Sequence, residues 1–442
     1  MKVAVVGSGY VGLITGLGLA SKGHFVLAID INSSRVAQIK SGIVPFHEPG
    51  VVELLKKCLK EKSFQISSSM EDVSSCEVVL ICVQTPSKLT GSIDLQFLKS
   101  ASLELSAIFS RHPKQRTVVV RSTVIPGTTA NFIVPIFKEK TDIVFNPEFI
   151  REGSALEDFL KPDRIVIGTN SDNAARVLKK LYAPFKAPVI LTTPTTAELA
   201  KYTSNALLAT LVSFSNEIAK ICELTVDTDV ENVLDIVHQD RRFRSSTNPA
   251  TKPGILAYLK AGCGFGGSCL PKDLSALISY ANSLGEKVPL LEAVVEVNKE
   301  QPVRIVKQLE KILGRLARIK VTVLGVAFKG GTDDLRGSPG LRIVDELLKN
   351  KTKVTIYDPL VKAELLKGYT DKGVVVAQNL RTSFKGADAC IIASNSPEFI
   401  VLSYLKRNPQ NKKPIIIDGR RILKLLFNKD GYFGVGRVFQ TN

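Results

Sequence analysis

One short segment holds the residue types that covalent chemistry needs. From Gly264 to Asp273 it reads GFGGSCLPKD, which brings Cys269 through a glycine-rich turn to a predicted helix start, because proline suits a first helical turn. The positive end of a helix and the neighbouring Lys272 both favour the thiolate. Asp273 follows one helical turn later, on the same face. The residues alone fit either a nucleophilic cysteine or a structural thiol buried after a turn.

A second glycine pattern stands near the N-terminus. The segment Gly7–Gly12 reads GSGYVG, directly after the apolar run Val3–Val6, and Asp30 ends the next expected strand. Such glycines let the backbone approach a pyrophosphate at a helix N-terminus. Asp30 would accept hydrogen bonds from a ribose and repel a 2′-phosphate, so the pattern predicts NAD, a preference that the nearby Arg35 weakens. The alternative is a glycine-rich turn that binds nothing.

The elements around these motifs indicate an α/β protein. In residues 1–195, short apolar runs alternate with helical stretches, which predicts a parallel sheet with helices on both faces. The expected strands are Val3–Val6, Val26–Ile29, Val78–Val83, Val118–Val120, Ile143–Phe145 and Ile165–Ile167. Residues 301–442 repeat this pattern, since Val354–Tyr357 precedes Asp358 as Val26–Ile29 precedes Asp30. We expect an NAD-binding domain at 1–195 and a second doubly wound, Rossmann-like domain at 301–442.

Residues 196–300 form a helical middle domain in this interpretation. No proline or glycine interrupts Thr196–Leu224, which predicts a long central helix that joins the two sheet domains. The helix carries more apolar residues than one contact needs, namely Leu199, Leu207, Leu208, Leu211, Val212 and Ile218. A second copy of the chain would cover them, so we expect a homodimer; the alternative is that the third domain covers them.

Composition excludes several classes of function. The net charge is +17, but the basic residues are spread along the chain without a basic block, which argues against nucleic-acid binding. No apolar run reaches the length of a membrane-spanning helix, and no signal peptide opens the chain, so we expect a cytoplasmic protein. The seven cysteines include no C-x-x-C pair, so no metal site is predicted, and Cys76, Cys82 and Cys390 are expected to be buried.

Further motifs follow one another in the order of a known family. They are Pro45–Gly50, Thr85-Pro86, Ser122–Val124, Asn146–Glu152, Ala197–Tyr202 with Asn205-Ala206, Phe328-Lys329, Asp333–Arg336 and Asp418–Arg420. With GSGYVG and GFGGSCLPKD, the chain resembles the UDP-glucose/GDP-mannose dehydrogenase family over essentially its whole length. The resemblance implies oxidation of the C6 alcohol of a nucleotide sugar to a carboxylate, with NAD as the hydride acceptor. The serine before Cys269 favours UDP-glucose, and GDP-mannose and other nucleotide sugars remain open.

The resemblance also implies roles for individual residues. Cys269 is the nucleophile that attacks the aldehyde, and Glu152 is the general base for thioester hydrolysis. Four further residues organise water and developing oxyanion charge: Thr123, Lys201, Asn205 and Asp273. The expected NAD contacts are Gly7, Gly9, Tyr10, Val11, Gly12, Asp30, Arg35, Thr85, Thr123, Glu152, Lys272 and Arg336. The expected UDP-sugar contacts are Glu148, Phe149, Lys201, Asn205, Arg242, Tyr258, Lys260, Gly266, Phe328, Lys329 and Arg420.

Two departures from the family pattern stand out. Extra residues, about 244–254, separate Arg242 from Cys269 when the chain is compared with short family members, so the register of Arg242 is open. Arg242 matches an arginine that the partner subunit contributes. Cys263 lies beside the glycines of the turn, and we interpret it as a passive lining residue.

Two other functions are consistent with parts of the pattern. A simple hydroxyacid dehydrogenase would stop after one hydride transfer and would need neither Cys269 nor a second doubly wound domain. A protein that binds sugar nucleotides without catalysis would not need the intact set of nucleophile, acids and lysine. A count of NADH formed per sugar distinguishes the three functions, as two, one or none.

Overall fold

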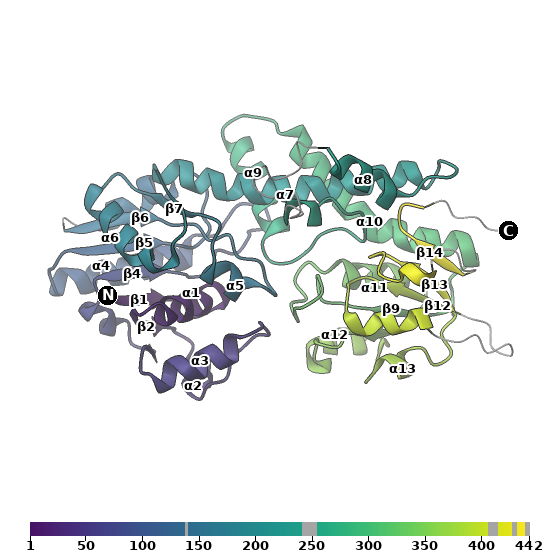
Figure 1. Cartoon of the computed structure of the whole chain (residues 1–442), viewed down its shortest axis with the longest axis horizontal. Helices are drawn as coiled ribbons and strands as arrows, with labels where there is room; N and C mark the ends of the chain where they lie inside the picture. The colour runs from purple at the N-terminus through teal and green to yellow at the C-terminus, as the bar shows by residue number, and fades with distance from the viewer. Residues whose placement is uncertain (138–139, 241–253, 405–413, 427–430, 438–442) are drawn as a thin grey trace. The chain divides into compact units, whose positions relative to one another are not determined.

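The computed structural model describes residues 1–137, 140–240, 254–404, 414–426 and 431–437. The chain divides into two compact units. The first comprises Met1–Ser204 with Ser279–Gly285, and the second comprises Asn205–Ile278 with Glu286–Asn442. Each unit contains a sheet with helices packed against it (Figure 1).

The first unit is built on an eight-stranded sheet in the order β3-β2-β1-β4-β5-β6-β7-β8. Its strands are β1 (Lys2–Val6), β2 (Phe25–Ile29), β3 (Phe64–Ser67), β4 (Val78–Ile81), β5 (Arg116–Val120), β6 (Thr141–Phe145), β7 (Ile165–Gly168) and β8 (Val189–Thr192). From β3 to β6 all neighbours are parallel, whereas β7 pairs antiparallel with β6 through Phe145 and Gly168. The six expected strands are therefore present, and β3 and β8 are strands that the apolar pattern did not indicate.

Both faces of the central strands of this sheet are buried, which explains why these strands are apolar without alternation. In β1, Val3 and Val5 pack into one core and Ala4 and Val6 into the core on the opposite face. The helices of this unit are α1 (Tyr10–Ser21), α2 (Ser33–Lys40), α3 (Val51–Lys60), α4 (Gln96–Arg111), α5 (Ala155–Leu160) and α6 (Asp172–Tyr182), followed by the first part of α7 (Pro194–Cys222). Most of α1 is buried, so it is apolar around nearly its whole circumference.

The second unit repeats the strand order of the first. Its sheet is parallel throughout in the order β11-β10-β9-β12-β13-β14, which corresponds to β3-β2-β1-β4-β5-β6. The strands are β9 (Lys320–Leu324), β10 (Lys353–Tyr357), β11 (Val375–Val376), β12 (Ala389–Ile392), β13 (Ile415–Asp418) and β14 (Tyr432–Gly434). The prediction of two doubly wound domains is therefore confirmed.

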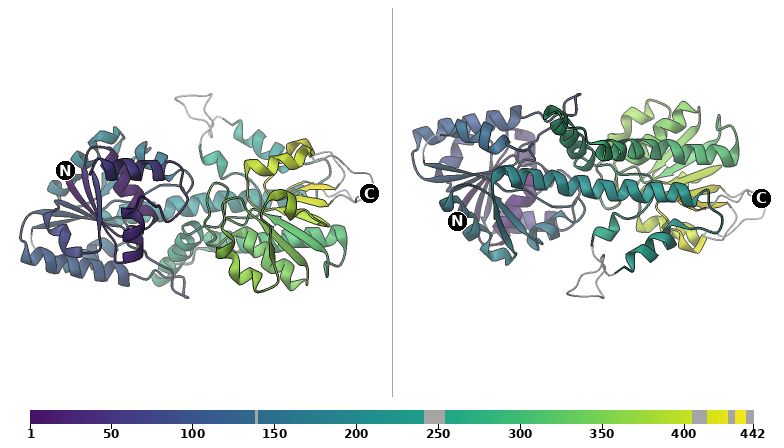
Figure 2. Two further views of the ribbon diagram at one scale, coloured as in Figure 1. Left: turned by 90° about the horizontal axis from the view of Figure 1, so that it is seen from below. Right: turned by 90° about the horizontal axis from the view of Figure 1, so that it is seen from above.

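Helices make up the remainder of the second unit. They are the second part of α7, α8 (Val230–His238), α9 (Leu270–Ser283, whose last turn belongs to the first unit), α10 (Pro289–Leu313), α11 (Pro339–Lys349), α12 (Lys367–Thr370) and α13 (Leu380–Ser383). Figure 2 shows α7 as one continuous helix, as predicted, although it begins and ends two residues earlier than expected. Within the described residues, no helix is both long and apolar enough to cross a membrane.

Candidate active site

The dinucleotide turn lies between β1 and α1, and its three glycines serve different purposes. Gly7 has a φ of +94°, and a Cβ there would lie 2.8 Å from the Cys82 carbonyl oxygen. A Cβ at Gly12 would lie 1.8 Å from the Gly7 carbonyl oxygen, so these two glycines are required by the fold. A Cβ at Gly9 would meet nothing within 4 Å. The space at Gly9, at the N-terminus of α1, is thus open, as the predicted pyrophosphate position requires.

Asp30 follows β2 and faces the same turn. Its buried carboxylate accepts hydrogen bonds from the Ser8 amide (2.8 Å), the Asn32 amide (2.9 Å) and Nη1 of Arg35 (3.0 Å). An ionised carboxylate can accept about four hydrogen bonds, so about one position is left for a ribose hydroxyl. Arg35 is paired with Asp30, so the Arg35 guanidinium is less available to bind a 2′-phosphate. This geometry agrees with NAD as the cofactor.

The loops that follow β4 and β5 contact each other beside this turn. The hydroxyl of Thr85 donates to the Thr123 carbonyl oxygen over 2.9 Å, and Ser122 Oγ donates to the Val83 carbonyl oxygen over 2.6 Å. Thr85 is buried and Thr123 is half-buried. The structure therefore brings these two predicted cofactor residues together at the carboxyl edge of the sheet, where ligands of doubly wound folds bind.

Glu148 and Lys201 form an ion pair inside the first unit. Glu148 Oε1 lies 2.9 Å from Lys201 Nζ, and their side chains are 6% and 4% exposed. Burial alone would raise the pKa of Glu148, but the Lys201 ammonium and the Ile150 amide outweigh it and lower that pKa. Glu148 is therefore ionised although the pair is buried. A glutamate and a lysine that belong to no such motif more often form a salt bridge on the surface. The Lys201 ammonium also lies 5.4 Å from the centre of the Phe149 ring.

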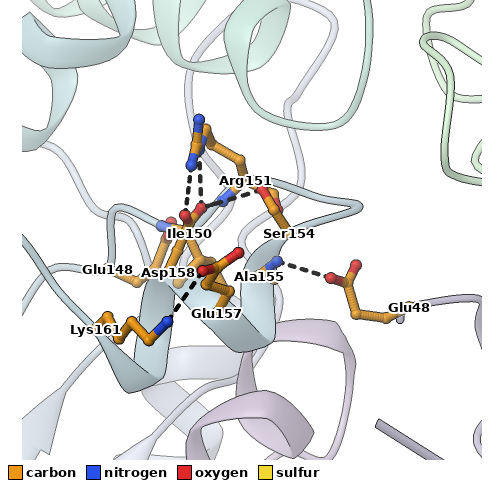
Figure 3. Close-up of polar contacts among 9 residues, drawn as sticks. All are labelled: Glu48, Glu148, Ile150, Arg151, Ser154, Ala155, Glu157, Asp158 and Lys161. Atoms are coloured by element: carbon orange, nitrogen blue, oxygen red, sulfur yellow. Dashed lines mark hydrogen bonds and ion pairs between the residues drawn. The ribbon is translucent and has the colours of Figure 1, made fainter. Parts of the chain in front are cut away.

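Two sets of charged contacts flank Glu152 in the chain, and the sequence motif alone did not indicate them. The guanidinium of Arg151 binds both carboxylate oxygens of Asp158, at 2.9 and 2.6 Å (Figure 3). The buried carboxylate of Glu48 accepts from the Gly153 and Ala155 amides, each at 2.7 Å. Glu48 belongs to the motif Pro45–Gly50, but the sequence pattern indicated no role for it.

The predicted nucleophile lies in the second unit, directly before α9. All seven cysteines belong to the described residues, and Cys269 is the exposed one, whereas the other six are buried. The Asp273 amide donates to the Cys269 carbonyl oxygen over 2.8 Å, which makes Cys269 the residue that starts the helix. The positive end of α9 favours the thiolate form of a cysteine at this position.

Asp273 is buried and has two partners. Asn205 Nδ2 and Lys272 Nζ each lie 2.6 Å from its carboxylate, on different oxygens. Its side chain is 2% exposed, so these two groups compensate for the loss of water around the charge. Three residues that were predicted to act in one site are thus in direct contact.

The glycine-rich turn before Cys269 is fixed by polar side chains of α10. Asn298 accepts from the Phe265 amide (2.7 Å) and donates to the Phe265 carbonyl oxygen (3.0 Å), while Gln301 donates to the Gly262 carbonyl oxygen (2.8 Å). Asn298 and Gln301 were not predicted from the sequence, because they are distant from this turn in the chain and belong to none of the motifs named above. Cys263 is fully buried, and burial raises its pKa to about 11, which fits a passive lining residue.

Several of the predicted substrate residues lie around this turn. The Phe328 ring fills the space beside Gly267, and Lys329 Nζ lies 5.6 Å from the centre of that ring. Arg420 donates to the Ala393 carbonyl oxygen through Nε at 2.7 Å and to the Gly264 carbonyl oxygen through Nη2 at 3.5 Å.

The remaining predicted residues of the second unit have defined places too. Gly266 is closely packed, because a Cβ there would lie 2.3 Å from the Gly337 carbonyl oxygen. The guanidinium of Arg336 pairs with Asp334. The backbone carbonyl oxygen of Arg336 accepts a hydrogen bond from the Gly267 amide. Tyr258 is half-buried and Lys260 is exposed, just before the glycine turn.

The predicted residues fall into two groups. The first unit holds Gly7, Gly9, Tyr10, Val11, Gly12, Asp30, Arg35, Thr85, Thr123, Glu148, Phe149, Glu152 and Lys201, and the second holds Asn205, Tyr258, Lys260, Gly266, Cys269, Lys272, Asp273, Phe328, Lys329, Arg336 and Arg420. Arg242 and nearly all of the extra loop at 244–254 lie outside the described residues.

Comparison with protein families gives the class of protein that this fold and site define. Residues 1–186 match an NAD binding domain, residues 195–300 a central domain and residues 322–425 a UDP binding domain, all three described for the UDP-glucose/GDP-mannose dehydrogenase family. The protein is thus an NAD-dependent dehydrogenase. It belongs to the UDP-glucose/GDP-mannose dehydrogenase family, which confirms the resemblance and the cofactor prediction.

Relatives of similar length support this assignment. The chain is 36% identical over 438 residues to UDP-glucose 6-dehydrogenase TuaD of Bacillus subtilis, covering 96% of this chain and 90% of that protein. The structure is similar to a UDP-glucose dehydrogenase from Pyrobaculum islandicum, with a TM-score of 0.90, 34% identity and coverage of 99% and 98%. It is also similar to a UDP-D-ManNAc dehydrogenase from Pyrococcus horikoshii, with a TM-score of 0.83, 30% identity and 99% coverage of both chains.

Proposed function

We propose that this enzyme oxidises the C6 alcohol of UDP-glucose to the carboxylate of UDP-glucuronate in two NAD-dependent steps. The observation that carries the proposal is the placement of Cys269: an exposed cysteine at the start of α9, one turn before a buried and fully paired Asp273. A dehydrogenase that stops at the aldehyde has no use for such a nucleophile.

In this proposal the C6 alcohol would give up one hydride and the thiohemiacetal a second one, each to a separate NAD molecule that the first unit would hold in turn. The thiol of Cys269 adds to the aldehyde carbonyl and forms that thiohemiacetal. Loss of its hydride and its hydroxyl proton gives a thioester on Cys269. Water then displaces the sulfur, so the carboxylate leaves and the thiol is restored. One alcohol, one water and two NAD thus give one carboxylate, two NADH and three protons.

The remaining residues have separate proposed roles. Glu152 removes a proton from the hydrolytic water, and Asp273 orients that water. Lys201, Asn205 and Thr123 stabilise the negative charge that develops on the sugar oxygen. The buried ion pair with Glu148 fixes the position of Lys201 Nζ, which such a role needs.

The proposed substrate rests on two observations. Residues 322–425 match a UDP binding domain, which favours a uridine over a guanosine nucleotide. Relatives named UDP-glucose 6-dehydrogenase are 34–36% identical over nearly the whole chain. In the second unit Lys329 and Arg420 supply positive charge for the diphosphate, and Phe328 supplies an aromatic surface.

We also propose that the enzyme is a homodimer that pairs through α7. Leu207, Phe214 and Ile221 are spaced seven residues apart on this helix and are 50%, 48% and 60% exposed. Seven residues make nearly two helical turns, so these side chains form one apolar stripe. Of the residues named from the sequence, Val212 and Ile218 instead pack against the core, and Phe214 and Ile221 replace them in the stripe.

The test is a count of NADH per sugar with a panel of nucleotide sugars. We expect two NADH for each UDP-glucose consumed and UDP-glucuronate as the product by mass spectrometry. One NADH per sugar would contradict the covalent mechanism, and a faster reaction with another nucleotide sugar would contradict the substrate.

A further inference from the structure

The carboxylate of Glu48 lies in the interior of the first unit and is occupied by three donors. Oε1 accepts from the Ala155 amide over 2.7 Å, and Oε2 accepts from the Gly153 amide over 2.7 Å and from the Tyr10 hydroxyl. The Glu48 residue is 5% exposed. A buried carboxylate of this kind is stable only while its donors stay in place, so it and its donors fix one another's positions.

Two of these donors are backbone groups on either side of Ser154. Ala155 is the first residue of α5, and the N-cap Ser154 makes no side-chain cap, so the Glu48 carboxylate takes the place of the missing cap. Gly153 has a φ of +82°, a conformation that the bond from its amide to Glu48 holds. Glu152 directly precedes Gly153, so its backbone is determined on its C-terminal side by Glu48.

On the N-terminal side of Glu152, a separate ion pair fixes the chain. The Arg151 amide and guanidinium both bind the Asp158 carboxylate on α5 (Figure 3). Asp158 is 14% exposed, whereas the Arg151 side chain is 53% exposed. The more deeply buried Glu48 contacts thus set the position of the loop, and Arg151 restricts what freedom remains.

The third donor connects this loop to the cofactor helix. Tyr10 is the first residue of α1, beside the open space at Gly9, and its ring packs on Phe46 with 4.7 Å between ring centres. Burial, and then the hydrogen bond to Glu48, raise the pKa of Tyr10. The hydroxyl therefore stays protonated and keeps donating to Glu48.

We propose that Glu48 is a positioning residue: it fixes the loop that carries Glu152 and connects that loop, through Tyr10, to the N-terminus of the NAD helix. The inference rests on the proposed role of Glu152 in thioester hydrolysis. Glu48 is not among the residues expected to contact NAD or the sugar, so we expect it to act on thioester hydrolysis through the position of Glu152.

The test uses Glu48→Gln in the full-length enzyme. The amide has the shape of the carboxylate, but its nitrogen cannot accept, so the Gly153 or the Ala155 amide loses its acceptor. Hydrogen exchange without substrate should become at least about tenfold faster at one or both of these amides, with the rest of the unit unchanged. Tyr10→Phe should have a smaller effect, since both amides keep their acceptors. The control is Glu53→Gln, an exposed glutamate on α3.

The second measurement is thioester hydrolysis, followed as acyl-enzyme on Cys269 after rapid quench. Glu48→Gln should slow this step roughly ten- to a hundredfold, because misplacement of a general base costs rate of this size. If Glu48 acts through Glu152, the variant with both Glu48→Gln and Glu152→Gln is no slower than Glu152→Gln alone.

The outcomes separate the two proposals. Unchanged exchange at Gly153 and Ala155 in Glu48→Gln would overturn the positioning role, whatever the kinetics. Multiplicative slowing in the double variant would overturn it as well, because Glu48 would then act independently of Glu152. Absence of acyl-enzyme in Glu152→Gln itself would refute the hydrolytic role of Glu152, and the exchange result would still decide whether Glu48 fixes the loop.

Discussion

Lys201 Nζ lies 2.9 Å from Glu148 Oε1, and both side chains are almost completely buried. Removal of one partner of such a pair leaves the other charge without compensation in the interior. We expect Lys201→Met to lower the free energy of unfolding of the first unit by about 3–5 kcal/mol. Thermal unfolding measures this loss. Lys220→Met is the matched control, because Lys220 on the same helix pairs with Glu300, which is 52% exposed, and its loss should cost about 0–1 kcal/mol.

The same pair predicts how stability depends on pH. The pKa of Glu148 is lowered below 4.5 in the folded protein, so the pair stabilises the fold above that pH and its contribution is lost as the pH falls through the folded pKa. In Lys201→Met burial still raises the pKa of Glu148, while the largest opposing cause is lost. Only the Ile150 amide and the Arg121 charge still lower that pKa. The difference in melting temperature between wild type and variant should therefore be largest at pH 7 and narrow toward pH 4. A difference that stays constant over this range would contradict an ionised pair.

Gly9 and Gly12 should respond differently to alanine. Gly9 has a φ of −71°, which alanine adopts readily, and its Cβ would enter open space. Gly9→Ala should keep the melting temperature but weaken NAD binding by about tenfold or more, since the methyl group occupies the place of the pyrophosphate. Gly12→Ala should lose the fold, because its Cβ would collide with Gly7. Calorimetric NAD titration with thermal melts distinguishes the two effects, and equal NAD affinity in Gly9→Ala would argue against the pyrophosphate position.

Cys269→Ser should abolish formation of the carboxylate while NAD still binds. The hydroxyl of serine is a far weaker nucleophile than a thiolate at the start of a helix, so the second oxidation should slow by several orders of magnitude. Product analysis by mass spectrometry with NADH counting measures it. Cys263→Ser tests a buried cysteine six residues away, and it should retain two NADH per sugar where it folds. Sustained formation of two NADH per sugar by Cys269→Ser would rule out the covalent route.

Phe214→Asp should dissociate the proposed dimer. A carboxylate in the middle of the apolar stripe on α7 would be buried without a partner at a self-complementary interface. Sedimentation over a dilution series should show monomers for this variant and dimers for the wild type. Leu365→Asp is the control, because Leu365 is 56% exposed but lies outside α7. A wild-type enzyme that sediments as a monomer at all concentrations would contradict the proposal.

Much of the fold could be predicted because its strands are buried on both faces. Val3–Val6 is apolar at every position for this reason, and a glycine turn and Asp30 follow in the expected order. β8 escaped prediction because its first three side chains are exposed, so it lacks the composition of a central strand. The antiparallel pairing of β7 also escaped prediction, because strand direction depends on the path of the connection and leaves no periodicity in the sequence.

The sequence predicted those parts of the site whose residues lie close together in the chain. It did not predict contacts between residues that are far apart in the chain. Cys269 and Asp273 are four residues apart, so the predicted helix start was enough to place them one helical turn from each other. Glu48 reaches Ala155 across 107 residues of chain, and Asn298 reaches Phe265 across 33. The sequence does not indicate which distant backbone amide will donate a hydrogen bond to a single polar side chain. Such contacts require the tertiary structure.

The interleaving of the two units has a consequence for synthesis on the ribosome. The first unit includes Ser279–Gly285, which follows residues 205–278 of the second unit in the chain. A nascent chain that has emerged only as far as Ser204 therefore lacks part of its cofactor-binding unit. Cys269 leaves the ribosome before that last segment does. All contacts of the first unit can therefore form only after Cys269 has been translated.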